Sequence, residues 1–393
     1  MKLVAVLLFG QLSQLSLKPW QPGAVFTPQD LAKMELHFQP VRAVPAFRLS
    51  GVEGYYRERL DDALLLGDLL FHAPKLLGPR AAVFGLSCAT CHPGGASNNT
   101  LFVEAQSDRP GNVDLLSPYF YAEADDGVFA PRNISSLRGC AKTAPYRRDG
   151  SVDTLEHANA LVVRHEFQQP LPQPWLEALS AYVARFELWP SPLVGPDGAL
   201  DARAEALARE GERVFDAKQC QLCHPKERGF TDRKQHPFRH GEGKGTLGRT
   251  ERFDTPTLSN LAETAPYFFD GSAPTLAAAV EQLDRRHALG LTERERAALV
   301  AYLGAVGAVP AAPVTWTKAE RIRQALAWAR LVEQGTDEKL WALCLDAMRH
   351  QARLAGDERL AAELHALGEG APTDEARVRL ARLRIGRQAA RRD

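Results

Sequence analysis

Two short stretches, CATCH at residues 88–92 and CQLCH at residues 220–224, decide how this chain is organised. Each is a C-x-x-C-H string, which is typical of the covalent attachment of c-type haem. The two thiols of such a string form thioether bonds to the haem, and the histidine that follows is held where its imidazole ligates the iron. The strings therefore predict two haem c groups, held by Cys88, Cys91, His92, Cys220, Cys223 and His224.

Zinc binding and dithiol redox chemistry are the alternatives for the same cysteines. A zinc site built from four cysteines does not need a histidine after each pair. A dithiol switch would not need that histidine twice. The repetition of the complete five-residue string favours haem.

The composition is that of an ordinary globular protein. The chain has 393 residues, of which 45% are hydrophobic and 24% charged, and its formal net charge is zero. This length suffices for two or three domains, and the balanced charge argues against a general nucleic-acid binder. Haem attachment uses four of the six cysteines, and Cys140 and Cys344 either pair in a disulfide or stay as buried thiols.

The N-terminus has features of an export signal. Met1 and Lys2 precede an apolar run at 3–9, a pattern that predicts a signal peptide over 1–17. The start of a buried strand or helix is the alternative, because no cleavage site of small residues is obvious. Haem c is attached outside the cytoplasm, so the motifs and the signal together predict a periplasmic protein. No other run approaches the 18 apolar residues that span a bilayer, so we expect a protein that does not span the membrane.

The chain contains an internal repeat. Residues 143–155 and 264–276 share nine identities at a constant offset of 121. Each copy leads from an Asp-Gly-Ser turn into a helix, expected at 154–166 and 275–287. Helical patterns also precede the two haem strings, at 58–71 and 203–214.

These observations predict a mostly α fold with two tandem cytochrome c-type haem domains related by the repeat, followed by a C-terminal helical extension. The expected boundaries are 18–59 for an N-terminal segment, 60–189 for the domain of haem 1, 190–202 for a Pro/Gly-rich linker, 203–309 for the domain of haem 2 and 315–393 for the extension. Glycines break the extension into four helical patterns, and it either docks on the core or binds a partner.

Residues 60–308 resemble the bacterial diheme cytochrome c peroxidases and their MauG-type relatives. Besides the two haem strings, the resemblance is carried by LGDLLF at 66–71, FTD at 230–232, FDTPTLSNL at 253–261, APYFFDGS at 265–272 and LVAYL at 299–303. It implies an electron-transfer haem in the C-terminal domain and a peroxide-reacting haem in the N-terminal one. It also implies a calcium ion between the domains, for which Asn133 matches a ligand, with an ordinary turn asparagine as the alternative.

Two departures from the family pattern concern electron transfer. Leu283 stands where the peroxidases have a methionine ligand to the second haem and the MauG branch has a tyrosine. Leucine cannot bind iron, so His287, one helical turn later on the same face, is a candidate sixth ligand, with His240 or a five-coordinate iron as alternatives. Arg148 stands where family members place a tryptophan between the haems. Tyr146 is a candidate replacement, with packing in the core as its alternative.

The far side of haem 1 is the third departure. Residues 93–156 contain no histidine or methionine, so haem 1 is expected to be open or to take a ligand from far along the chain. Cleavage of a peroxide needs a group that moves a proton between the two oxygens. Glu166 is the first candidate because the family's distal glutamate lies near this place, and His157 and His165 are the others. His236 matches a histidine near the second haem, where a propionate hydrogen bond is the expected role.

The resemblance implies reduction of hydrogen peroxide at haem 1, with electrons relayed through haem 2 from a small periplasmic donor, a cytochrome c or a cupredoxin. A MauG-like oxidation of a residue on a partner protein is the first alternative, and the missing methionine favours it slightly. A non-enzymatic electron carrier or haem sensor, with the C-terminal helices as its partner module, is the second.

Overall fold

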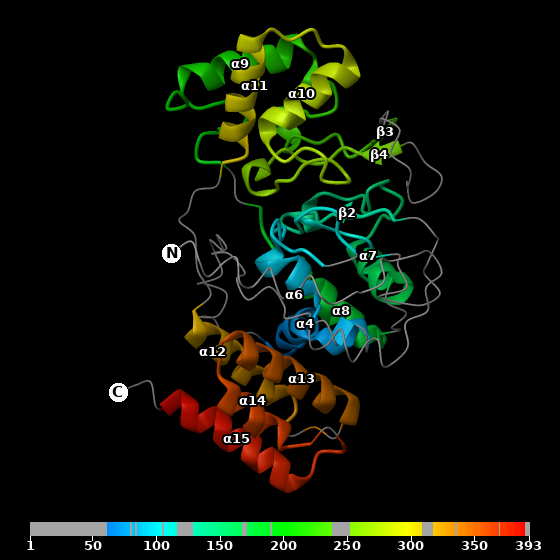
Figure 1. Ribbon diagram of the computed structural model, residues 1–393, viewed down its shortest axis with the longest axis vertical. Helices are drawn as coiled ribbons and strands as arrows, with labels where there is room; N and C mark the ends of the chain where they lie inside the picture. The colour runs from blue at the N-terminus through cyan, green and yellow to red at the C-terminus, as the bar shows by residue number, and fades with distance from the viewer. Residues whose placement is uncertain are drawn as a thin grey trace, which may run out of the picture.

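The computed structural model describes residues 61–78, 81–82, 85–103, 106–115, 129–166, 171–188, 191–237, 252–308, 317–333, 335, 337–368 and 370–389, without the side chains of 165–166 and 386–389. The predicted signal peptide at 1–17, the segment at 18–59 and His240 lie outside these residues. We call 61–188 the first half, 191–308 the second half and 317–389 the tail. The three are stacked along the long axis of the molecule, with the first half in the middle (Figure 1).

The fold is mostly α, as predicted, and the described residues contain two small two-stranded sheets. The first half contains α4 (Asp62–His72), α6 (Cys88–Cys91), α7 (Leu155–Leu161) and α8 (Gln173–Val183), with β1 (Asn112–Val113) antiparallel to β2 (Arg132–Asn133). The second half contains α9 (Ala206–Ala217), α10 (Leu276–His287) and α11 (Glu293–Val306), with β3 (Gln235–Pro237) antiparallel to β4 (Arg252–Asp254). The tail consists of α12 (Lys318–Trp328), α13 (Glu338–Leu354), α14 (Glu358–His365) and α15 (Asp374–Ala389).

Side chains that cap the helices explain where several of them begin. Asp61 accepts from the backbone N–H of Leu64 at the start of α4, and Thr292 and Glu295 form a reciprocal capping box at the start of α11. Thr154 and Thr275 cap the two helices of the repeat. The first of these is shorter than expected, because α7 changes at Val162 into a π-helical turn that continues to Glu166.

The same helix crossing occurs once in each half. Where α4 crosses α8, Gly67 lies against Ala178 and Tyr182, and where α9 crosses α11, Gly211 lies in the same way against Ala298 and Tyr302. In both crossings a Cβ on the glycine would overlap the backbone carbonyl of the alanine. The tyrosine of each crossing also packs on a phenylalanine, Phe71 at 5.4 Å and Phe215 at 5.0 Å between ring centroids. The division into two haem domains at the expected boundaries stays a prediction.

Replacing Gly67 by alanine is expected to destabilise the protein by about 1–3 kcal/mol, because overpacking forces two helix backbones apart. Gly304 in α11 is the matched control, since nothing lies within 4 Å of a Cβ added there. Gly304→Ala should instead stabilise by about 0.5–1 kcal/mol, the usual gain of alanine over glycine inside a helix. Thermal unfolding of the two holoprotein variants measures the difference. Equal melting temperatures would contradict the close helix contact.

The turn that the repeat encodes is also the same in both halves. Tyr146 pairs with Val152 across a short antiparallel bridge and its hydroxyl donates to the backbone oxygen of Cys140 at 3.0 Å. Tyr267 pairs with Ala273 and its hydroxyl donates to Leu261 at 3.1 Å. This equivalence favours a packing role for Tyr146 over a redox role.

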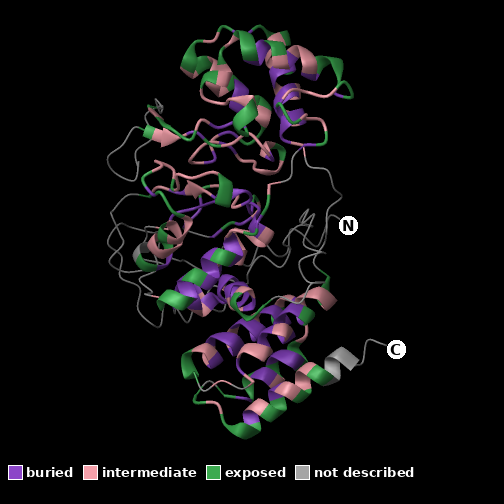
Figure 2. Cartoon of the chain, turned by 180° about the vertical axis from the view of Figure 1, so that it is seen from behind, coloured by how far each residue is buried: buried purple, intermediate pink, exposed green. Residues whose placement is uncertain are grey.

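The tail docks on the core of the first half. Buried residues of α4 and α8 and of α12, α13 and α14 form one apolar cluster, whereas the second half has clusters of its own. Figure 2 shows this continuous buried region running from the first half into the tail. Cys140 and Cys344 are separate buried free thiols and form no disulfide. In the described residues no helix is both long and apolar enough to cross a membrane.

Candidate haem sites

The first C-x-x-C-H string forms the one-turn helix α6 on the surface of the first-half core. The backbone N–H of Ser87 donates to Thr90 Oγ1 at 3.0 Å, which closes a capping box at its start. Cys88 and Cys91 pack against the apolar cluster that α4 and the tail share. Burial raises the pKa of the Cys88 thiol to about 12. A reactive dithiol requires a lowered pKa instead, so the surroundings disfavour the dithiol alternative.

His92 follows this helix and is suited to ligate a metal. Burial lowers the pKa of its imidazole to about 4, which the backbone of Ser135 opposes and the charge of Arg148 reinforces. Part of the residue is exposed, yet its Nδ1 is buried and makes no hydrogen bond. A neutral imidazole is the form that binds metals, so this side chain fits a haem iron ligand.

His224 of the second string is held in a defined orientation. Its Nδ1 lies 2.9 Å from the backbone oxygen of Phe230. A carbonyl oxygen only accepts, so Nδ1 carries the proton and Nε2 keeps the lone pair that an iron would bind. Burial also lowers the pKa of His224 and raises that of the neighbouring Cys220 thiol to about 11. Here too the environment keeps the ligand neutral and the thiol unreactive.

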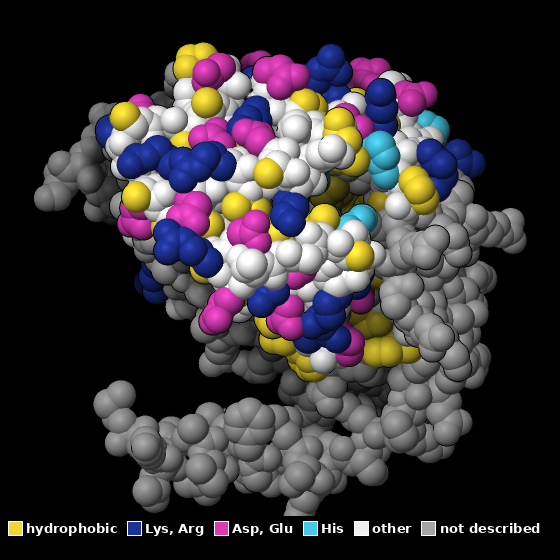
Figure 3. Space-filling model, turned by 90° about the horizontal axis from the view of Figure 1, so that it is seen from above, with side chains coloured by type: hydrophobic (Ala, Val, Ile, Leu, Met, Phe, Trp, Pro, Cys, Tyr) yellow, Lys and Arg dark blue, Asp and Glu magenta, His cyan; other side chains and the backbone are white. Residues whose placement is uncertain are grey.

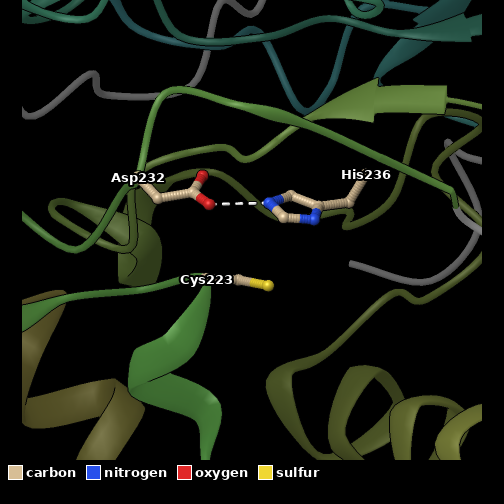
Figure 4. Close-up of side chains that lie close together, drawn as sticks. All are labelled: Cys223, Asp232 and His236. Atoms are coloured by element: carbon tan, nitrogen blue, oxygen red, sulfur yellow. Dashed lines mark hydrogen bonds and ion pairs between the residues drawn. The ribbon is translucent and has the colours of Figure 1, made fainter.

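Cys223, Asp232 and His236 lie together beside this second string (Figure 4). Their potential ligand atoms are within 4.8 Å of one another, and His236 Nε2 lies 2.6 Å from Asp232 Oδ2. Cys223 is one of the two thiols that haem attachment consumes, and the other two side chains bond to each other. These two facts favour a place beside the predicted haem 2 over a separate metal centre. The propionate bond expected of His236 stays a prediction, and its observed partner is Asp232.

One face of the second half is hollowed (Figure 3). Figure 3 looks down on the second half and shows hydrophobic side chains in the hollow and histidines at its rim, surrounded by interspersed acidic and basic side chains. His287 is exposed at the end of α10, and Leu283 is half-buried one turn earlier. Ligation by His287 stays a prediction.

The structure does not bring the three distal candidates together. His157 is exposed on α7, and its backbone N–H donates to Thr154 Oγ1. His165 and Glu166 lie in the π-helical turn that follows, and their side chains are outside the described part of the chain. Their approach to haem 1 stays a prediction.

Asn133 lies where the two halves meet. Its Nδ2 donates to the backbone oxygens of Pro266 at 2.7 Å and Phe268 at 3.1 Å. Its Oδ1 is buried without a hydrogen-bond partner, which fits an oxygen ligand of a hard cation. The guanidinium of Arg148 donates to the backbone oxygen of the same residue, so one positive charge is already present. The calcium ion stays a prediction.

Arg148 joins the two halves in a way that the sequence did not suggest. Besides its bond to Asn133, its own backbone oxygen accepts from the N–H of Asp254 at 2.8 Å. Asp254 Oδ1 is buried without a hydrogen-bond partner, and burial followed by the charge of Asp232 raises the pKa of this carboxyl to about 6.

The sequence also missed a buried polar cluster under the tail, in which Asp68 accepts from Trp328 and Gln324. In the sequence, only the carboxylate of Asp68 within the apolar stretch ALLLGDLLF of α4 pointed to this cluster.

The family model described as di-haem cytochrome c peroxidase matches residues 215–312. Cytochrome c551 peroxidase of Nitrosomonas europaea is 27% identical over 290 residues, which cover 67% of this chain and 81% of that protein. The methylamine utilization protein MauG of Methylorubrum extorquens is 26% identical over 332 residues, covering 72% and 87%. These matches support a likeness of this chain to the diheme cytochrome c peroxidase and MauG superfamily.

The likeness to this superfamily implies two c-type haems, and attachment at the two C-x-x-C-H strings stays a prediction. The superfamily's relatives extend beyond the peroxidases. Hydrazine synthase subunit gamma of Kuenenia stuttgartiensis is 27% identical over 243 residues, covering 48% of this chain and 62% of that protein. Two haem sites in such a chain therefore do not by themselves fix the reaction.

Proposed function

We propose that this protein is a periplasmic peroxidase that reduces hydrogen peroxide at haem 1, with electrons relayed through haem 2 from a small cytochrome c or cupredoxin. The observation that carries the proposal is the lack of a nearby protein ligand for the far side of haem 1. The stretch from 93 to 156 offers no histidine or methionine to occupy the far side of haem 1. An iron with an open position can take peroxide, whereas an iron with two protein ligands transfers electrons.

The residues of this chain would position and protonate the substrate. When bound, the haems supply the redox chemistry. His92 and His224 would hold the irons as neutral imidazoles, and the bond from His224 to Phe230 fixes its ring. Glu166 takes the proton from one peroxide oxygen and returns it to the leaving oxygen, with His157 and His165 as the other candidates.

Replacing Glu166 by glutamine tests this role. We expect the rate of reaction with peroxide to fall by about 10²–10⁴, the usual contribution of a positioned acid–base group. Glu177→Gln on the exposed face of α8 is the control and should leave the rate unchanged. Stopped-flow spectra of the oxidised and half-reduced holoprotein after addition of peroxide give the rates. The proposal would be contradicted if both haems were low-spin and six-coordinate and did not react with peroxide in the oxidised or the half-reduced protein. Electron transfer or sensing would then remain as the function.

The MauG-like reaction is the second candidate, because Leu283 stands where the peroxidases have a methionine ligand. A protein that consumes peroxide with a reduced small cytochrome is a peroxidase. A protein that consumes peroxide only while a co-purifying partner becomes oxidised follows the MauG reaction instead.

A further inference from the structure

The buried polar cluster between α4 and α12 joins a tryptophan to a carboxylate. Asp68, which is 1% exposed, accepts from Trp328 Nε1 at 2.7 Å through Oδ2 and from Gln324 Nε2 at 2.9 Å through Oδ1. His72 Nδ1 lies 3.2 Å from the same Oδ1. Trp328 itself is fully buried. The indole therefore sits in a low-dielectric core with an acidic side chain on its N–H.

An indole in this setting is easier to oxidise than an ordinary one. Loss of one electron leaves a positive charge on the ring and makes its N–H strongly acidic. A carboxylate at hydrogen-bond distance stabilises that charge, strongly so away from water, and can accept the proton. We propose that Trp328 is an oxidisable residue that holds one of the two oxidising equivalents produced when peroxide reacts at haem 1.

A packed series of rings connects Trp328 to the first haem string. The ring centroids of Trp328 and His72 are 5.7 Å apart, those of His72 and Phe71 5.5 Å, and those of Phe71 and Phe186 5.2 Å. Phe186 packs directly on Gly95, which follows His92 by three residues. In Figure 1, α4 lies between α12 below and α6 above. The route from the indole to the haem attachment site thus crosses only packed side chains.

Two other tryptophans among the described residues show why the setting of Trp328 is special. Trp341 is equally buried, but its Nε1 donates at 3.1 Å to the uncharged backbone oxygen of Gly368. Trp175 has the ammonium of Lys339 over its ring at 5.5 Å, and a cation there opposes the loss of an electron. Trp328 alone of these three has a carboxylate on its N–H.

The step balances with hydrogen peroxide as the oxidant. Peroxide would take one electron from haem 1 and one from the indole of Trp328. One peroxide oxygen would leave as water with both peroxide protons, the other would stay at haem 1, and the indole proton would move toward Asp68. Two electrons from the one-electron donor would later restore haem 1 and the indole, two protons from solvent would release the second oxygen as water, and the indole proton would return to Nε1. The inference rests on the proposed reaction of haem 1 with peroxide.

The test is freeze-quench EPR of the oxidised holoprotein after mixing with peroxide, with tryptophan deuterated on the ring to assign the radical. We expect a tryptophan radical in the wild type and in Trp341→Phe, and its loss in Trp328→Phe. Asp68→Asn keeps an oxygen acceptor for the indole but removes the charge, so it should lower the radical yield about tenfold. If Trp328→Phe does not fold, the radical yield of Asp68→Asn tests the proposal in its place.

Optical spectra of the same samples separate the two ways of failing. Haem spectra that do not change with peroxide would overturn the proposed function, and this inference with it. Haem spectra that change without any tryptophan radical, or with a radical that survives in Trp328→Phe, would overturn the role of Trp328 alone. An unchanged yield in Asp68→Asn would show that the carboxylate does not stabilise the oxidised indole, and would overturn the proposal as stated.

Discussion

A chain that ends at residue 314 is expected to lose the fold of the first half while the second half stays folded. The reason is that α12, α13 and α14 complete the apolar cluster of the first half, with fully buried residues that include Leu326, Trp328, Trp341, Leu345 and Leu360. Each large apolar side chain contributes about 1.5–3 kcal/mol when buried. Loss of several of them is comparable to the total stability of about 5–15 kcal/mol that a domain has.

Scanning calorimetry of the holoprotein measures this effect. The full chain should show a transition for the first half together with the tail and another for the second half, and truncation should remove only the former. Truncation after residue 370 is the milder control, because it removes α15 and leaves α12 to α14 in place. A truncated chain that keeps both transitions would show that the tail is a separate module.

Replacing Cys88 and Cys91 by serine is expected to leave one covalent haem per chain and to abolish the reaction with peroxide. Replacing Cys220 and Cys223 should also leave one haem. In this variant the oxidised haem 1 should still react with peroxide, but the protein should no longer turn over with an external donor. The reason is that only thiols form the thioether bonds, and each string holds its own haem. Intact-protein mass and stopped-flow spectra report the haem number and the reactivity.

Cys140→Ala is the matched control for this pair of variants, because Cys140 is buried and bonds only weakly, to the backbone oxygen of Val183. It should keep two haems and the wild-type reaction. Loss of a haem in this control, or two haems in either double variant, would refute the assignment of the strings.

Local pattern predicted the helices well but not what covers them. The repeat at 143–155 and 264–276 gave two matching turns, and the glycines of the tail gave the breaks between its helices. An amphipathic pattern tells which face of a helix is apolar and not which surface it meets. The docking of the tail on α4 therefore had to come from the structure, as did the bond between Asp68 and Trp328.

Candidate site residues could be predicted from the sequence where the side chains that act together are neighbours along the chain. The thiols and histidines of both strings stand close enough along the chain to be recognised together. The contacts of Arg148 with Asn133 and Asp254 join residues up to 106 positions apart, and no local signal marks them. The early change of α7 into a π-helical turn was missed because the periodicity of its side chains does not report a shift in backbone hydrogen bonding.

The position of the tail also sets an order of events during synthesis. Asp68 and Trp328 are 260 positions apart, so the cluster around α4 cannot close until most of the chain has been made. Contacts between residues so far apart in the sequence form late in folding, because closing the long loop between them costs conformational entropy. The second half has its own cores and no such requirement. The core on which Cys88 and Cys91 pack is therefore complete only once the helices of the tail are in place.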